Sequence, residues 1–243
     1  MYRYQLEKAN DWFYFYGVDD NHYPHNMQQL PEVAETFFPE ITKQPLKIVN
    51  GKLVNSPMAF PDNGIIFLNT AGSTYYSQTI YQIGHELCHF YINANMVDVH
   101  LRPNMFWFEE TLCEISSHLF LDEYMKRLGW DNKVQSMPYD SYSQFLLSEQ
   151  FIQPFNTKAL FLAYSQEIEY LKNHSTDRLK NSYVAKILLP IFRQLPSLLQ
   201  EARKLRNIYS ISDFETFLNA WADCVSQEHK SAIREIKENL LLL

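Results

Sequence analysis

The chain has 243 residues, a formal net charge of −7 and a hydrophobic fraction of 46%. Its longest apolar runs, such as Leu240 to Leu243, fall far short of the ~20 residues of a membrane-spanning helix. Lysine and arginine are spread along the chain, so the electrostatic footprint of a nucleic-acid binder is missing. The first residues also lack the apolar stretch of a secretory signal. We therefore expect a soluble, cytoplasmic protein.

Glycine is scarce, with 6 residues, and long stretches are periodic in their apolar residues. Both features favour helix over repeated tight turns. The expected fold class is therefore α+β and mostly helical. The cysteines are Cys88, Cys113 and Cys224, and no pair has the spacing of a zinc ribbon or redox motif. We expect three reduced, buried thiols.

Residues 1–71 are predicted to carry the sheet. The aromatic run 12–16 indicates helix or irregular structure, and a short helix is expected over 30–38. Two apolar, β-branched segments bounded by turn residues, 46–49 and 64–68, predict strands. Leu53-Val54 is a candidate return strand after the Asn50-Gly51 turn. The prediction is a short antiparallel sheet that precedes the next helix.

Residues 72–130 and 131–243 are predicted to be helical. Apolar residues recur at helical spacing over 77–93, and a second helix is expected over 105–128. The C-terminal part is expected to form a helical lobe, whose predicted segments are 141–150, 157–173, 176–189, 196–207, 212–225 and 228–241. Pro154, Pro190 and Pro196 punctuate these segments. We expect one compact unit, residues 1–243, rather than two independent domains.

The sharpest signal is His85-Glu86-Leu87-Cys88-His89. Helical residues four apart lie on one face, so both imidazoles can bind one metal ion, and neutral imidazole suits Zn²⁺. Glu86 lies beside that face, where it can act as a general base toward a metal-activated water. We interpret Cys88 as a core thiol. Gly84 precedes the motif, and a glycine inside a helix usually permits the close approach of another backbone, which we expect to be the neighbouring strand.

A catalytic zinc needs a third protein ligand as well as an open position. The second helix carries Glu109, Glu110 and Glu114, 20 to 25 residues beyond His89. Burying three acids in an aromatic, apolar helix is costly unless they are paired. A metal ion and the groups that orient its ligands would offset that cost.

These residues resemble the gluzincins, the zinc metallopeptidases with HExxH and a Glu ligand on the following helix. The resemblance covers about residues 65–117. Trp107-Phe108-Glu109-Glu110 is similar to the Trp-x-x-Glu of several members, which implies Glu110 as the ligand. Glu114 then matches the acid that orients the first histidine, His85. Glu109 is the alternative ligand, and it would leave Cys113 at that orienting position. The resemblance also implies that 64–69 is an edge strand that binds extended substrate.

Members of this group commonly use a downstream Tyr or His to stabilise the oxyanion. Tyr183, in a polar patch that opens an apolar helix, is our first choice, and the alternatives are Tyr164, Tyr170 and His174. His118 continues the Glu110–Glu114 stripe and is either a second supporting residue or an ordinary satisfied histidine.

The resemblance implies a zinc-dependent hydrolase that cleaves peptide bonds in a peptide or protein substrate. Zinc would be held by His85, His89 and Glu110, with Glu86 as the base. Two alternatives remain open: a non-catalytic zinc-binding or regulatory protein that keeps the peptidase fold, and a helical interaction module in which the motif is accidental. The substrate and the oligomeric state do not follow from the sequence.

Overall fold

The structure, a computed structural model, describes residues 2–5, 13–17, 29–39, 41, 45–50, 54–70, 75–93, 104–128 and 133–242. It is α+β and mostly helical, as predicted. The chain divides into two compact units: unit 1 comprises Met1–Asn95 and Ser116–Ser143, and unit 2 comprises Met96–Ile115 and Gln144–Leu243. The expectation of a single gluzincin-like unit stays a prediction. In the described residues, no helix is both long and apolar enough to cross a membrane.

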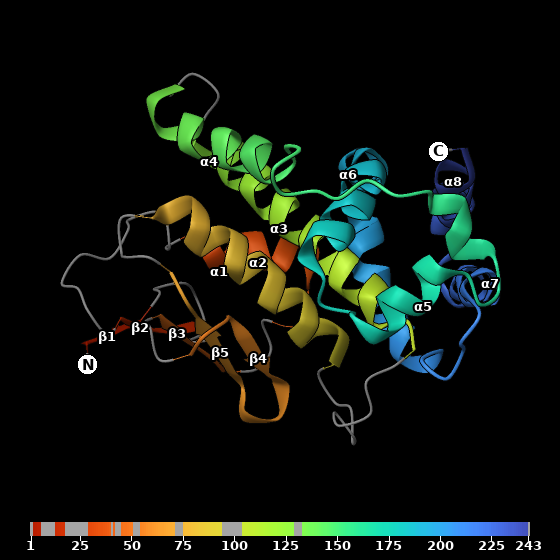
Figure 1. The fold of residues 1–243 in the computed structure, drawn as a ribbon. Coiled ribbons are helices and arrows are strands. Elements are labelled where there is room, and N and C mark those ends of the chain that lie inside the picture. The colour runs from red at the N-terminus through yellow and green to blue at the C-terminus, as the bar shows by residue number, and fades with distance from the viewer. Residues whose placement is uncertain are drawn as a thin grey trace. The chain divides into compact units, whose positions relative to one another are not determined.

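Unit 1 contains a five-stranded sheet in the order β1-β2-β3-β5-β4 (Figure 1). Its strands are β1 (Tyr2–Gln5), β2 (Phe13–Gly17), β3 (Leu46–Asn50), β4 (Met58–Phe60) and β5 (Ile65–Leu68). The two outer pairs, β1–β2 and β4–β5, are antiparallel, whereas β2–β3 and β3–β5 are parallel. The sheet is therefore mixed, and the prediction of an antiparallel sheet is wrong for its centre.

Three further predictions about this sheet are wrong. The aromatic run at 12–16 belongs mostly to strand β2, not to a helix. No hairpin follows Asn50, because β2 and β5 occupy both sides of β3 and Val54 lies in a bend; Leu53 is outside the described residues. Strand β5 is not the edge, since β4 pairs beside it. The sequence pattern missed β4 because three residues are too few to show an alternation.

The helices of unit 1 lie close to their predicted positions. They are α1 (Leu30–Phe37), α2 (Tyr76–Asn93) and the C-terminal half of α3 (Phe106–Leu128), followed by α4 (Lys133–Leu146), which starts earlier than predicted. Helix α2 contacts β4 and β5 (Figure 1). Aromatic rings join α1 to both long helices: Phe38 packs on Tyr91 of α2 with ring centroids 4.9 Å apart, and Phe37 packs on Phe120 of α3 at 5.2 Å.

Gly84 is the point of closest approach between α2 and α3. A Cβ atom at this position would lie 2.9 Å from Cγ of Phe120 and 3.1 Å from Cα of Ser117. Ser116 Oγ donates a hydrogen bond to the Gly84 carbonyl oxygen, at 2.7 Å. The glycine therefore does permit a close approach, as predicted, but the partner is helix α3 and not a strand.

Replacing Gly84 with Ala should lower the free energy of unfolding. Overpacking at the α2–α3 contact costs about 1–3 kcal/mol, whereas the better helix propensity of Ala alone would add about 1 kcal/mol of stability. We expect the clash to win, because the obstructing atoms are core atoms of Phe120 and backbone of Ser117. Urea titration measures the difference. Ser116→Ala, which only removes the hydrogen bond, should cost about 1 kcal/mol, and a Gly84→Ala protein more stable than wild type would contradict the close packing.

The described part of unit 2 is mostly helical. Its α-helices are α5 (Gln166–Asn173), α6 (Arg178–Gln194), α7 (Phe214–Cys224) and α8 (Lys230–Leu242), and its 3-10 helices are η4 (Thr157–Phe161), η5 (Pro196–Asn207) and η6 (Gln227–His229). The predicted helix over 157–173 is two elements, because the Ser165 side chain caps the start of α5. The predicted end of a helix at Leu189 is wrong, since α6 continues through Pro190 to Gln194.

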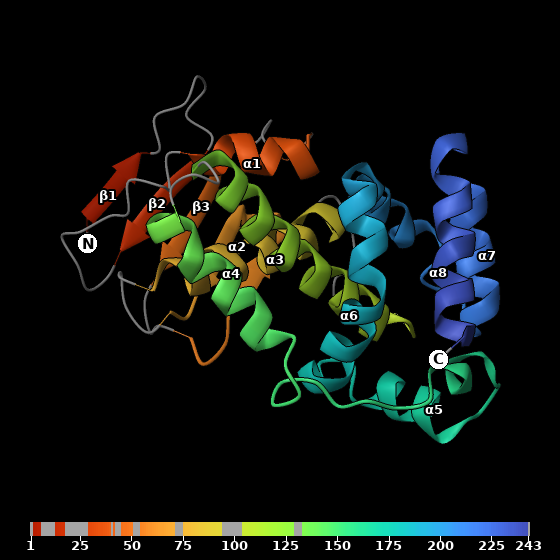
Figure 2. The same ribbon diagram turned by 90° about the horizontal axis from the view of Figure 1, so that it is seen from above.

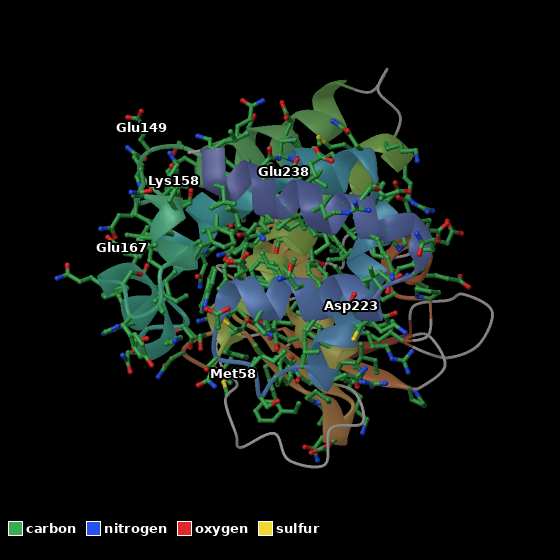
Figure 3. The ribbon with its side chains drawn as sticks, turned by 90° about the vertical axis from the view of Figure 1, so that its right-hand side faces the viewer. Met58, Glu149, Lys158, Glu167, Asp223 and Glu238 are labelled. Atoms are coloured by element: carbon green, nitrogen blue, oxygen red, sulfur yellow. The ribbon has the colours of Figure 1, made fainter. Side chains whose placement is uncertain are left out.

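The core of unit 2 is aromatic. The N-terminal half of α3 contributes Trp107 and Phe108, which pack on Phe214 of α7 with ring centroids 4.9 and 5.4 Å apart. Helices α7 and α8 lie side by side (Figure 2) and expose charged residues such as Asp223 and Glu238 (Figure 3). Apolar residues of the same two helices, such as Phe217 and Ile236, are fully buried and form core.

Candidate metal centre

The HExxH residues lie on α2, as predicted. His85 and His89 are one helical turn apart on the same face, and their ring centroids are 5.0 Å apart at an interplanar angle of 66°. Both histidines are half-buried, whereas Glu86 is 5% exposed. Glu86 follows His85 directly, so an ion held by the two imidazoles would lie near the Glu86 carboxylate. Because Glu86 is buried, few water molecules compete for hydrogen bonds to that carboxylate.

Helix α3 adds a third ligand type. Ser116, Ser117 and Phe120 fix α3 against Gly84, immediately before His85. Cys113 lies one turn earlier on the same continuous helix. One ligand atom each of His85, His89 and Cys113 lies within 4.8 Å of the others, and Cys113 is fully buried. This spacing suits three donors around one ion.

The sequence did not predict Cys113 as a ligand. Glu110 is half-buried on α3, three residues before Cys113, and is not a member of the group of ligand atoms described above. Its role as third ligand stays a prediction. Cys113 follows Glu109 by four residues and Glu110 by three, so it lies on the same side of the helix as both acids. This spacing was the signal that could have identified Cys113.

The two other acids of α3 are buried and have protein partners in unit 2. The Tyr209 hydroxyl donates a hydrogen bond to the carboxylate of Glu109, which is fully buried. Arg178 Nε lies 3.3 Å from Glu114 Oε1. Burial raises the pKa of Glu114, while the Arg178 guanidinium and a hydrogen bond from Ser182 act in the opposite direction. Pairing with side chains thus offsets the cost of burying these carboxylates, and that cost does not by itself require a metal. The proposed contact of Glu114 with His85 stays a prediction.

The candidate oxyanion donors have other neighbours in unit 2. The Tyr183 ring packs on Phe155 with centroids 5.5 Å apart. Tyr164 is 87% exposed. Tyr170 donates a 2.8 Å hydrogen bond to Asp177, which raises the pKa of Tyr170, and its ring stacks on His174 at 4.3 Å. Tyr183 stays the predicted donor, and Tyr209, beside Glu109, is a hydroxyl that the sequence reasoning overlooked.

The remaining residues behave mostly as expected. His118 is buried, with Nδ1 2.7 Å from Ser143 Oγ, so it is a satisfied core histidine. Cys88 is a fully buried thiol, as predicted. All three cysteines are free. The prediction that all are buried is wrong for Cys224, which is exposed near the end of α7.

The donor set fits zinc. Zn²⁺ takes imidazole nitrogen and thiolate sulfur in tetrahedral sites, and catalytic sites combine three protein ligands with one open position. Two histidines and a cysteine satisfy both conditions, and a soft thiolate disfavours Mg²⁺ or Ca²⁺. The chain matches no protein-family model, no curated protein and no solved structure.

Proposed function

We propose that the protein is a zinc-dependent hydrolase, and specifically a gluzincin-like metallopeptidase. The observation that carries the proposal is the group of His85, His89 and Cys113, with ligand atoms within 4.8 Å of one another beside the buried Glu86. Hydrolysis requires a base next to the metal, and the HExxH helix supplies one.

The roles of the residues follow from their chemistry. His85 and His89 would hold the ion, with Cys113 or Glu110 as the third ligand. When bound, zinc acts as a Lewis acid that polarises the scissile carbonyl and lowers the pKa of a water. Glu86 accepts a proton from the attacking water and delivers it to the leaving amine. A hydroxyl such as that of Tyr183 donates a hydrogen bond to the oxyanion.

The proposal extends to the substrate and the compartment. A peptide or protein substrate is consistent with the absence of a clustered basic stripe in the sequence. Three free cysteines and no disulfide among the described residues support a reducing, cytoplasmic setting.

Metal analysis tests the zinc half of this proposal. We expect purified protein to contain one zinc ion per chain, and metal-stripped protein to take it up again. His85→Ala and His89→Ala should each lose the ion, because a site of three protein ligands is reduced to two. His174→Ala is the matched control, since this exposed histidine stacks on Tyr170 and has its Nδ1 atom 3.0 Å from the Tyr170 carbonyl oxygen. Wild-type protein that takes up no zinc would contradict the proposal.

A further inference from the structure

A second cluster of reactive side chains lies entirely within unit 2. Ser197 and Glu201 are on η5, Ser226 precedes η6, and His229 ends η6. The Nε2 atom of His229 is 2.9 Å from Ser197 Oγ, and its Nδ1 atom is 2.8 Å from both Glu201 Oε1 and Ser226 Oγ. A hydroxyl, an imidazole and a carboxylate are thus connected in series, which is the order that nucleophilic serines require.

The carboxylate fixes the tautomer of the histidine. Burial alone would raise the pKa of Glu201, but hydrogen bonds from His229 and from the Ser226 backbone and side chain outweigh it and lower that pKa. Glu201 is therefore an acceptor only, and the hydrogen between it and His229 belongs to Nδ1. In the neutral ring Nε2 then carries a lone pair, and it faces the Ser197 hydroxyl.

His229 and Glu201 are buried, whereas Ser197 is more exposed, as a reactive serine must be. His229 and Glu201 are 4% and 8% exposed, which keeps water from their hydrogen bond. Ser197 is half-buried and is the second residue of η5, so a reagent can reach it. The Glu201 backbone is fixed as well, because its carbonyl oxygen accepts a 3.1 Å hydrogen bond from Trp221 Nε1.

We propose that Ser197 is an activated nucleophile for acyl transfer from small esters, with His229 as its general base and Glu201 as the positioning residue. Ser197 Oγ forms a bond to the ester carbonyl carbon while its proton moves to His229 Nε2. The bond from that carbon to the leaving alkoxide oxygen breaks, and the same proton goes to the alkoxide. A water oxygen then forms a bond to the acyl carbon while one water proton moves to His229 Nε2. The bond from that carbon to Ser197 Oγ breaks, Oγ takes the proton from His229, and the acid is released.

A fluorophosphonate probe tests this with the full chain. The probe phosphonylates an activated serine with loss of fluoride, and mass spectrometry of digested peptides locates the adduct. Ser148 is an internal control, because it is also half-buried but donates to the Phe145 carbonyl oxygen rather than to an imidazole. We expect Ser197 to react about 100-fold faster than Ser148, the lower range of general-base assistance. A Ser197 that reacts no faster than Ser148 would overturn the proposal.

Two further measurements separate reactivity from folding and from zinc. Ser197→Ala should abolish the adduct while leaving circular dichroism and thermal unfolding unchanged, because it removes one half-buried oxygen. Glu201→Gln should slow labelling about tenfold or more and shift the ¹⁵N signals of the His229 ring away from the Nδ1–H tautomer. Unchanged signals together with unchanged labelling would rule out the positioning role. A zinc chelator should leave labelling intact, so this proposal and the metallopeptidase proposal fail independently.

Discussion

Glu86→Gln should lower the turnover of a cleaved peptide by about 10²–10⁴-fold, the usual contribution of a general base. Gln has nearly the same shape as Glu but cannot accept a proton, and the position is 5% exposed, so bulk water is a poor substitute. Because the Glu86 carboxylate is not among the grouped ligand atoms, zinc content should stay at the wild-type value. The expected result is therefore a folded, zinc-loaded and nearly inactive protein.

The measurement is the rate of cleavage across a peptide library, followed by mass spectrometry, with zinc content determined on the same samples. Glu167→Gln is the matched control, since Glu167 is a half-buried acid in the first turn of α5 (Figure 3). A Glu86→Gln protein that cleaves as fast as wild type would show that another group is the base. Zinc-loaded wild-type protein that cleaves no peptide would instead favour the non-catalytic zinc-binding alternative.

The long helices could be predicted because their signals are local. The apolar spacing from Ile80 to Tyr91 predicts α2 to within a residue, and the same pattern predicts α3. The histidines four apart on α2 follow directly from that periodicity. The sheet could not be predicted equally well, because the parallel pairing of β2 with β3 joins segments some 30 residues apart, and strand partners leave no local trace in one sequence.

Contacts between side chains that are far apart in the sequence could not be predicted from local patterns either. Spacing along α3 places Cys113 on the side of the two glutamates, but the approach of Cys113 to the histidines of α2 is seen only in the folded chain. The pairing of Glu109 with Tyr209 spans 100 residues. His229 and Ser197 are 32 residues apart and carry no motif, so their hydrogen bond appears only in the folded chain.

The second large expected effect is on zinc affinity, and it depends on which residue is the third ligand. If Cys113 is the ligand, Cys113→Ser should weaken zinc binding by about 100-fold or more, since losing a residue that merely supports a ligand already costs 10–100-fold. Glu110→Gln should then have a much smaller effect. Competition with a chromogenic chelator measures both affinities. Cobalt substitution gives an independent readout, because a thiolate ligand produces a sulfur-to-cobalt charge-transfer band that Cys113→Ser would abolish.

The opposite pattern would restore the ligand set that the resemblance implies. Glu110→Gln would then cost the larger factor, Cys113→Ser would leave zinc in place, and cobalt-loaded protein would lack the charge-transfer band. The grouped ligand atoms favour the thiolate, because Sγ of a fully buried Cys113 is already within 4.8 Å of both histidine ligand atoms. A bound thiolate would also donate more charge to zinc than a carboxylate, and would weaken its Lewis acidity. The third ligand would therefore set how strongly a bound zinc polarises the scissile carbonyl.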